Sequence, residues 1–344
     1  MTPTTHPEKK QAPASLFNLV IYAHEASRVE HFEELIQTIL SKFPCRIIFI
    51  HAYGKEEDHF LVRSSRVLTG KGQEQTVCDR TVIEASKKQL PRVLSVLFPA
   101  INPDLPIYLL WGQSPFEEHL IFPALRPYAA RVIIDSGCYD NLPLFCRQME
   151  THLNLLKMDL MDLNWALLSS WRDLLSSLFD RPDKQLLLNS CKSIILTYNS
   201  TATERTWHPE LRAIYLQGWL AACLGATFMK AEYFEQNLLL SYMGKKNPLV
   251  IALEPQPDFD HPAGTILGAA FSFINGDSYA ILPKPALSQA IVHESSLDTC
   301  ALPYTLPLPN VYAGTTFLNE ILYQSVGDHY RKMLKMISNL TSYQ

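Results

Sequence analysis

The chain has 344 residues and a mass of 39.1 kDa, which predicts about two domains at roughly 100–200 residues per domain. Hydrophobic residues make up 47% and charged residues 19%, so a core can form and wholesale disorder is excluded. The net charge of -4 argues against non-specific binding to nucleic acid or anionic membranes, and the low count of 13 Gly disfavours glycine-rich phosphate loops.

The cysteines and the hydropathy pattern indicate the compartment. Seven cysteines are dispersed along the chain, no two of them are spaced C-x-x-C, and most lie in apolar runs. Such thiols are typical of buried residues in a reducing compartment. No apolar run approaches the ~18 residues needed to cross a bilayer, and residues 1–13 lack the apolar stretch of a signal peptide. We therefore expect a soluble, cytoplasmic protein in which residues 1–14 are disordered.

Strand and helix patterns alternate in the first half of the chain, as in a parallel α/β sheet. The apolar run 17–22, the helical spacing over 25–42 and the run 45–50 predict a right-handed βαβ unit. A hairpin over 60–84, with glycines 70 and 72 in its turn, interrupts this alternation. The further predicted elements are helices over 86–97, 116–128 and 142–158 and strands over 107–111 and 131–135. Residues 15–160 thus read as a Rossmann-like α/β domain with a mostly parallel sheet and an antiparallel hairpin insertion.

The second half follows an α+β pattern. A long helix over 209–224 is expected to end at Gly225, which suits a helix C-cap, and Asn275-Gly276 predicts a tight hairpin. The further predicted elements are helices over 163–168, 171–179 and 316–340, strands over 193–198, 249–254 and 290–294, and a hairpin over 265–282. Residues 161–344 are therefore predicted to form an α+β domain with antiparallel hairpins.

No motif for catalysis or for a cofactor is apparent in the sequence. The first strand ends in Tyr22-Ala23-His24 and the G-x-G-x-x-G fingerprint is absent, so side chains would obstruct the close approach of a pyrophosphate. No spacing of Cys and His matches a zinc site. We expect no catalytic residue, no cofactor and no metal.

The run Asp135-Ser136-Gly137-Cys138 follows a predicted strand and contains side chains of the kinds that enzymes use as nucleophiles. Ser136 or Cys138 would be a nucleophile if a distant histidine served as its base. In the alternative that we favour, the run is a turn in which Asp135 and Ser136 cap the next helix.

The segment 161–180 stands out for its two tryptophans. Ser170 and Asp173 have the spacing of a capping box, and Asp162 is placed to cap the short helix before it. Trp165 and Trp171 either pack in the core or anchor a partner together with Arg172, because Trp and Arg are enriched in interface hot spots. Since a positive charge near a helix start is disfavoured, we expect Arg172 to make a specific contact, with Asp162 or with an acidic group of a partner.

The same segment resembles the signature D-L-N-W-x-x-L-x-x-W-R-[DE]-L-L-x-x-L-F-D of the OpcA family, the glucose-6-phosphate dehydrogenase assembly proteins. Other stretches agree with the family in order: 43–48, 77–79, 90–94, 103–111, 131–136 and 217–225. The match is good over residues 16–180, continues to Gly225, and is weak beyond it.

The resemblance implies a non-catalytic assembly factor or allosteric activator that binds glucose-6-phosphate dehydrogenase in the oxidative pentose phosphate pathway. Neither nucleic acid nor a membrane is an expected partner, and the sequence leaves self-association open. The candidate partner-binding residues are Asp162, Asn164, Trp165, Trp171 and Arg172. The alternative is a sugar-phosphate-processing enzyme of the same pathway, with a site at the strand ends near Trp111 and Asp135.

Overall fold

A computed structural model describes residues 15–24, 26–54, 58–69, 76–117, 119–155, 159–203, 206, 208–309 and 315–340. The chain divides into two compact units, Met1–Val132 and Ile133–Gln344. This boundary precedes residue 160, where the sequence pattern suggested it, because the helix α4 (Leu142–Leu155) packs against the distant helix α10 (Asp328–Ser338). The predicted disorder of residues 1–14 concerns positions outside the described residues.

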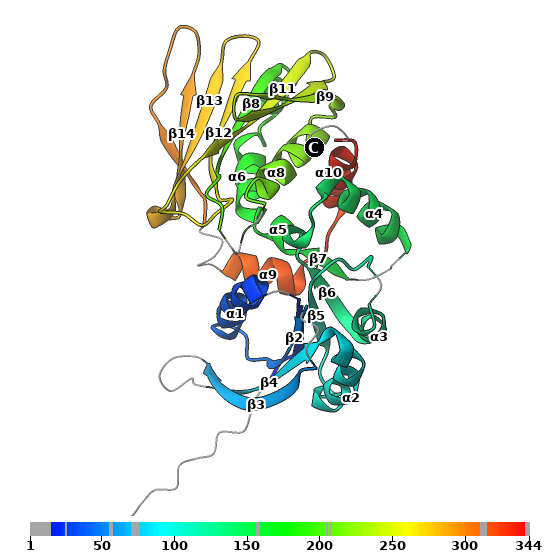
Figure 1. Ribbon diagram of the computed structural model, residues 1–344. Coiled ribbons are helices and arrows are strands. Elements are labelled where there is room, and N and C mark those ends of the chain that lie inside the picture. Colours follow the sequence, from blue (N-terminus) through cyan, green and yellow to red (C-terminus); the bar gives the residue numbers. More distant parts are fainter. Residues whose placement is uncertain are drawn as a thin grey trace, which may run out of the picture. The chain divides into compact units, whose positions relative to one another are not determined.

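The first unit is built on a mostly parallel sheet (Figure 1). Its strands are β1 (Asn18–Ala23), β2 (Arg46–Tyr53), β3 (Phe60–Thr69), β4 (Thr76–Ser86), β5 (Ile107–Gly112) and β6 (Ala129–Ile134). They lie in the order β3-β4-β2-β1-β5-β6. β1 pairs in parallel with β2 and β5, β2 pairs in parallel with β4, and β3 runs antiparallel to β4 at the sheet edge. The predicted Rossmann-like order with an antiparallel insertion is confirmed, while the turn glycines 70 and 72 lie outside the described residues.

Three helices accompany this sheet: α1 (Ala26–Leu40), α2 (Leu90–Ala100) and α3 (Ile121–Leu125). α2 has Pro91 in its first turn, where the missing N–H of proline costs no hydrogen bond. The helix predicted over 116–128 is shorter in the structure, and a 3₁₀ turn containing Pro127 follows it. All residues of β1 are buried, as its unbroken apolar run predicts for a central parallel strand.

The second unit is an α+β unit with a mixed sheet of eight strands. They are β8 (Cys191–Asn199), β9 (Thr227–Phe234), β10 (Asn237–Met243), β11 (Pro248–Gln256), β12 (Ile266–Phe273), β13 (Ser278–Lys284), β14 (Gln289–Ser295) and β15 (Tyr304–Pro307). Their order is β15-β14-β13-β12-β8-β11-β10-β9. β8 and β11 are parallel, and every other neighbouring pair is antiparallel. The hairpin between β12 and β13 turns at Gly276, whose φ of 89° suits glycine.

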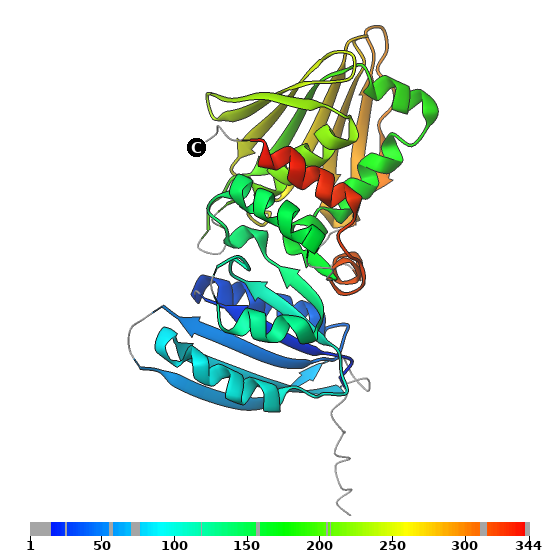
Figure 2. The same ribbon diagram turned by 90° about the vertical axis from the view of Figure 1, so that its right-hand side faces the viewer.

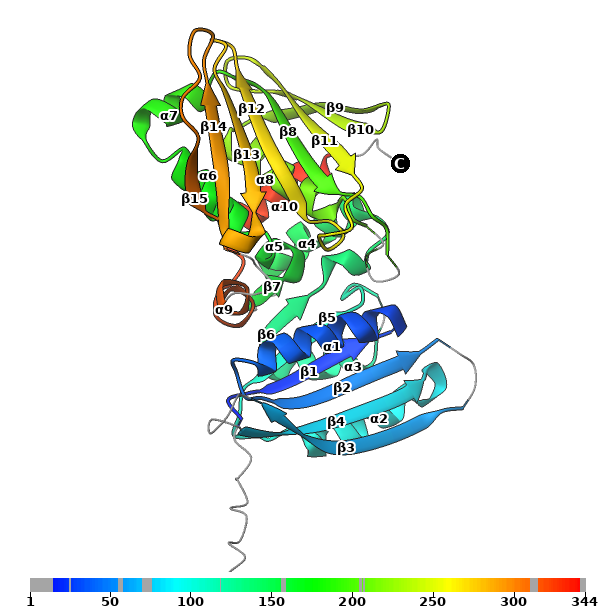
Figure 3. The same cartoon turned by 90° about the vertical axis from the view of Figure 1, so that its left-hand side faces the viewer.

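Helices of the second unit gather on one face of this sheet (Figure 2). They include α6 (Ser169–Leu178), α8 (Leu211–Cys223) and α10. α8 and α10 pack closely at Gly218, because a Cβ there would lie 2.9 Å from Cγ1 of Ile337. The helix α8 ends before Gly225, whose φ of 62° confirms the predicted C-cap. The opposite face of the sheet is turned toward the viewer in Figure 3, with the helices behind it.

Several elements of the second unit differ from the prediction. The helix expected over 316–340 is two helices, α9 (Thr315–Tyr323) and α10, separated by residues 324–327. The strands β9, β10 and β15 and the helix α7 (Pro182–Leu188) were not predicted. β9 and β15 are the two edges of the sheet and contain no buried residue, so they lack the clean apolar alternation that marks a buried strand. None of the described helices is long and apolar enough to cross a membrane.

Candidate functional site

Asp162 is the centre of a buried hydrogen-bond cluster in the second unit. It is the last residue of β7 (Leu160–Asp162), and its side chain caps the following helix α5 (Leu163–Ala166) by accepting a bond from the Asn164 N–H at 2.9 Å. The predicted cap is therefore confirmed. The carboxylate also accepts bonds from Ser136 Oγ at 2.8 Å, Tyr215 Oη at 2.8 Å and Tyr330 Oη at 2.9 Å.

These four bonds hold a carboxylate that is fully buried. Burial raises the pKa of Asp162 to about 6, and the bonds from Ser136, the two tyrosines and the Asn164 N–H counter only part of that rise. Burial also raises the pKa of Tyr215 and Tyr330, so both remain protonated donors at neutral pH. The two tyrosines come from α8 and α10, and sequence reasoning missed both. For Tyr215 the sequence does carry a signal. This tyrosine lies within an almost wholly apolar helix, and a buried hydroxyl needs a hydrogen-bond partner.

The run Asp135–Cys138 belongs to the same cluster. Asp135 accepts a bond from the Gly137 N–H at 2.9 Å, so its predicted role as a cap is confirmed, although the element it caps is a 3₁₀ turn. The Asn164 side chain donates to Asp135 Oδ1 at 3.1 Å and to Ser136 Oγ at 3.0 Å. The predicted capping role of Ser136 is wrong, because its hydroxyl donates to Asp162 instead. Its burial within this network does not favour the nucleophile alternative.

The two tryptophans of the segment are buried in the second unit. Trp165 is 3% and Trp171 is 6% exposed, and the Trp165 ring packs edge-on against Tyr330 with centroids 5.5 Å apart. The helix α6 begins at Ser169 with no side-chain cap, so the predicted capping box of Ser170 and Asp173 is wrong. Hydrophobic packing decides where this helix starts, since five of its first seven residues are buried.

Arg172 makes the specific contact that its position predicts, but with a different residue. Its guanidinium carbon lies 3.8 Å from the centroid of the Trp165 ring, and Nη2 lies 3.5 Å from Oε2 of Glu320 in α9. The expected pairing with Asp162 is wrong, because four other donors already surround that carboxylate. Burial lowers the pKa of Arg172 and raises that of Glu320, because loss of solvent disfavours the charged form of each group. Arg172 therefore ties α6 to α5 and α9.

We expect Arg172→Ala to lower the free energy of unfolding by about 1–3 kcal/mol, because the change removes the stacking on Trp165 and leaves Glu320 unpaired. Thermal melting of wild type and variant measures the loss. Arg181→Ala is the matched control, since that arginine is 73% exposed and pairs with the exposed Asp183, a contact expected to contribute less than about 1 kcal/mol. Equal melting temperatures for Arg172→Ala and wild type would contradict an internal role.

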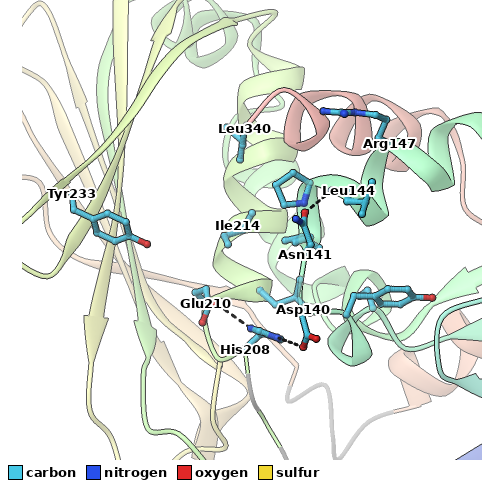
Figure 4. Close-up of a pocket in the computed structure, with 14 residues that line it drawn as sticks. Asp140, Asn141, Leu144, Arg147, His208, Glu210, Ile214, Tyr233 and Leu340 are labelled. Atoms are coloured by element: carbon cyan, nitrogen blue, oxygen red, sulfur yellow. Dashed lines mark hydrogen bonds and ion pairs between the residues drawn. The ribbon is translucent and has the colours of Figure 1, made fainter. Parts of the chain in front are cut away.

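A cleft of about 420 Å³ lies beside the Asp162 cluster and includes Ser136 in its wall (Figure 4). His208 lies between two carboxylates, with Nε2 3.9 Å from Asp140 Oδ1 and Nδ1 3.5 Å from Glu210 Oε1. Arg147 and Tyr233 also line it. Carboxylates balance the basic side chains, so the cleft has no surplus of positive charge with which to select a phosphate. Within the described part of the chain, no group of three His, Cys, Asp or Glu is arranged to hold a metal ion.

The carboxyl ends of β1 and β5 meet where the strand order of the first unit reverses, the place where open α/β sheets bind ligands. Aromatic side chains fill it. The Tyr22 and Trp111 rings are stacked with centroids 4.2 Å apart, and His119 Nε2 lies 2.8 Å from Tyr22 Oη. Burial lowers the pKa of His119 to about 4, so it is neutral at pH 7. Gly112 allows α1 to approach closely, because a Cβ there would overlap the Phe32 ring.

The fold places the chain in a structural class. It is similar to a 3-ketoreductase from Actinomadura kijaniata, with 11% identity, 96% of each chain covered and a TM-score of 0.53. It is also similar to an oxidoreductase from Bacillus cereus, with 7% identity, 95% and 96% of the chains covered and a TM-score of 0.51. At these identities the likeness concerns the fold alone: a Rossmann-type unit followed by an α+β unit.

The particular family is shown by the sequence. Residues 36–150 match the family model described as the glucose-6-phosphate dehydrogenase subunit N-terminal domain, and residues 158–246 match the one described as its C-terminal domain. The chain belongs to the OpcA family. Relatives include candidate OxPP cycle proteins OpcA from Synechocystis sp. (24% identical over 251 residues, 71% of this chain) and Synechococcus elongatus (24% over 200 residues, 56% of this chain). The chain spans 51% and 42% of their lengths, about half.

Proposed function

We propose that the chain is a non-catalytic protein that associates with glucose-6-phosphate dehydrogenase and serves as its assembly factor or allosteric activator. The two matching family models carry the description of a subunit of that enzyme, and together they extend over most of residues 36–246. An activator of this kind shifts the dehydrogenase only if it binds the active state more tightly than the inactive one.

One observation of the first unit supports a role without dinucleotide chemistry. A bound pyrophosphate requires close approach to main-chain N–H groups at the end of the first strand. Here Tyr22, Trp111 and His119 occupy that position, and Gly112 at the end of β5 is packed against Phe32. In this sheet, side chains of the chain itself fill the carboxyl ends of the strands, where Rossmann folds bind dinucleotides. Such a sheet is suited to a structural role or to binding another protein.

The alternative of a sugar-phosphate-processing enzyme is not favoured by the residues that suggested it. Trp111 is fully buried within its aromatic stack, and Asp135 is 3% exposed and bonded to Gly137 and Asn164. Neither side chain is presented to a substrate.

Addition of the purified chain to the dehydrogenase of the same organism should change the rate of NADP reduction in a saturable manner, and the two proteins should migrate together in size exclusion. Titration at fixed enzyme concentration measures the stoichiometry. The chain alone, assayed with glucose 6-phosphate and with 6-phosphogluconolactone, is the control and should show no turnover. Turnover that follows the chain through size exclusion would overturn the proposal that the chain is non-catalytic. The absence of both co-migration and a rate change would overturn the proposal that the dehydrogenase is its partner.

What the segment of Asp162, Asn164, Trp165, Trp171 and Arg172 contributes to partner binding stays a prediction. Because the side chains of Asp162, Trp165 and Trp171 are buried, we propose that they act by fixing the shape of the surface that α5 and α6 present. The Arg172→Ala variant separates the two roles: lost activation with unchanged melting would indicate direct contact with the dehydrogenase.

A further inference from the structure

A second pocket of the second unit lies where the start of α6 meets the ends of β12 and β13, elements that Figure 3 labels. Its volume is about 210 Å³. Four prolines, Pro262, Pro283, Pro285 and Pro309, line it together with Trp171. We call it the proline pocket. Among the described residues it shares none of its wall with the cleft of Figure 4, so it is a separate site.

The walls of the proline pocket are held in place without a ligand. Proline locks its own φ at about −65°, which limits the movement of the backbone around the pocket. The loop that carries Pro262 is fixed by the buried Asn199, whose Nδ2 donates to the carbonyl oxygen of His261 at 2.8 Å. Arg212 donates to the carbonyl oxygen of Ala263 in the same loop. A pocket with fixed walls binds at a lower cost in conformational entropy than one that its ligand must order.

One polar group in this wall lacks a partner. Ser170, the second residue of α6, is 2% exposed and lines the pocket. No hydrogen-bond partner of its Oγ lies among the described residues. A buried hydroxyl without a hydrogen bond costs free energy, and a serine hydroxyl needs only rotation about one bond to meet a group placed beside it. Ser170 is therefore the point at which a ligand would offer a polar atom.

The size and the walls of the pocket suit a single aromatic ring. An apolar cavity of about 150 Å³ takes up a benzene ring, so a volume of about 210 Å³ leaves room for a ring with small substituents. The Trp171 ring offers an aromatic surface against which such a ring packs favourably. Water gains less here, because an ordered water makes about three hydrogen bonds and the apolar walls offer few partners. Displacement of poorly ordered water by an apolar group favours binding.

The polar substituent of the ring should be a neutral hydroxyl rather than a carboxylate. Within the described wall the basic side chains are Arg212 and His261. Arg212 already donates to the Ala263 carbonyl oxygen, and His261 Nδ1 lies 3.0 Å from Asp258 Oδ1. A carboxylate in the pocket would have to compete for these groups or remain an unpaired buried charge, which is costly. A hydroxyl needs only a hydrogen bond with Ser170.

We propose that the proline pocket binds a phenolic ring, which packs against Trp171 and shares a hydrogen bond between its hydroxyl and Ser170. Such a ring is the side chain of a tyrosine on a partner protein or part of a free phenolic molecule, and the same chemistry recognises both. Binding of a phenol to the purified chain requires no dehydrogenase, so its failure is distinct from a failure of the proposed function.

Calorimetric titration of the purified full chain with p-cresol, the side-chain analogue of tyrosine, tests the proposal. The dissociation constant should be on the order of 0.1 mM. Ser170→Ala should weaken p-cresol binding roughly tenfold and should not weaken the binding of toluene, which lacks only the hydroxyl. Ser176→Ala, at an exposed position of the same helix, is the matched control and should weaken neither. Absence of p-cresol binding, or an equal effect of Ser170→Ala on both ligands, would overturn the proposal.

Filling the pocket tests the position of the site. Thr265→Trp, at a half-buried position of the wall, places a large ring in the pocket and should abolish p-cresol binding with an unchanged circular dichroism spectrum. Thr265→Ala is the matched control. It removes the same hydroxyl, which donates to the Pro262 carbonyl oxygen at 2.7 Å, and leaves the space open. Binding of p-cresol that survives Thr265→Trp would place the phenol elsewhere and overturn the proposal.

The same two variants identify the source of the ring. If a tyrosine of the dehydrogenase occupies the pocket, Thr265→Trp should lose co-migration with that enzyme in size exclusion, whereas Thr265→Ala should retain it. If both variants co-migrate with the enzyme, the tyrosine source is wrong and the pocket takes a free phenolic molecule.

Discussion

Replacing Trp171 by alanine should lower the free energy of unfolding of the second unit by about 3–5 kcal/mol. The ring is 6% exposed and lies on the buried side of α6 together with Leu174, Leu175 and Leu178. Its removal forfeits the burial of the largest side chain on that helix and leaves a cavity. Because native domains are stable by only about 5–15 kcal/mol, this loss is a substantial fraction of the total stability.

Urea unfolding monitored by far-UV circular dichroism measures this loss. Leu186→Ala is the matched control, since this leucine of the neighbouring helix α7 is 71% exposed and should change stability by less than about 0.5 kcal/mol. A Trp171→Ala protein that keeps wild-type stability and loses binding to the dehydrogenase would show that the ring is an interface anchor.

The Asp162→Asn variant should differ from wild type in how stability depends on pH. Burial raises the pKa of Asp162 to about 6 in the folded protein from the ordinary value of 3.8. The folded state therefore holds this proton more tightly than the unfolded chain does. The stabilisation is complete below about pH 4 and is lost as the pH rises through about 6, a change of about 3 kcal/mol. An asparagine at this position does not titrate, so the variant lacks this contribution.

Urea unfolding of both proteins at pH 4 and pH 7 checks the prediction. The free energy of wild type minus that of Asp162→Asn should fall by about 2 kcal/mol between the two values, since the unfolded carboxyl is already partly ionised at pH 4, and taking the difference cancels the titration of all other groups. Asp180→Asn, which removes an exposed carboxylate, should leave the wild-type pH dependence in place. A difference between wild type and Asp162→Asn that is constant with pH would show that Asp162 titrates normally.

Together these variants separate two ways in which a buried segment can serve a partner. Arg172, Trp165 and Asp162 join α5 to α6, α8, α9 and α10 through contacts that lie inside the second unit. Under the proposed function, loss of any of them should act on activation of the dehydrogenase through the stability of that unit. A residue that touches the partner directly should affect activation without affecting stability.

Local sequence rules were sufficient wherever a feature depends on a few neighbouring residues. The β1–α1–β2 unit, the cap at Asp162 and the turn at Gly276 all follow from hydrophobic period, side-chain length or the need for positive φ. The same rules failed at β9 and β15, which are edge strands. They also failed at the capping box of α6, because packing of the tryptophan face overrides the preference for a cap.

Sequence patterns were enough to predict the family, the order of the elements in the first unit and the segment that contains Asp162. The side chains that surround this segment depend on how distant helices pack against it. Tyr215 and Tyr330 are 53 and 168 residues from Asp162 and reach it because α8 and α10 pack on each other at Gly218. Glu320 likewise meets Arg172 through the placement of α9. Such partners cannot be predicted from spacing along one chain, because a hydrogen bond depends on the final position of two elements whose local patterns carry no information about each other.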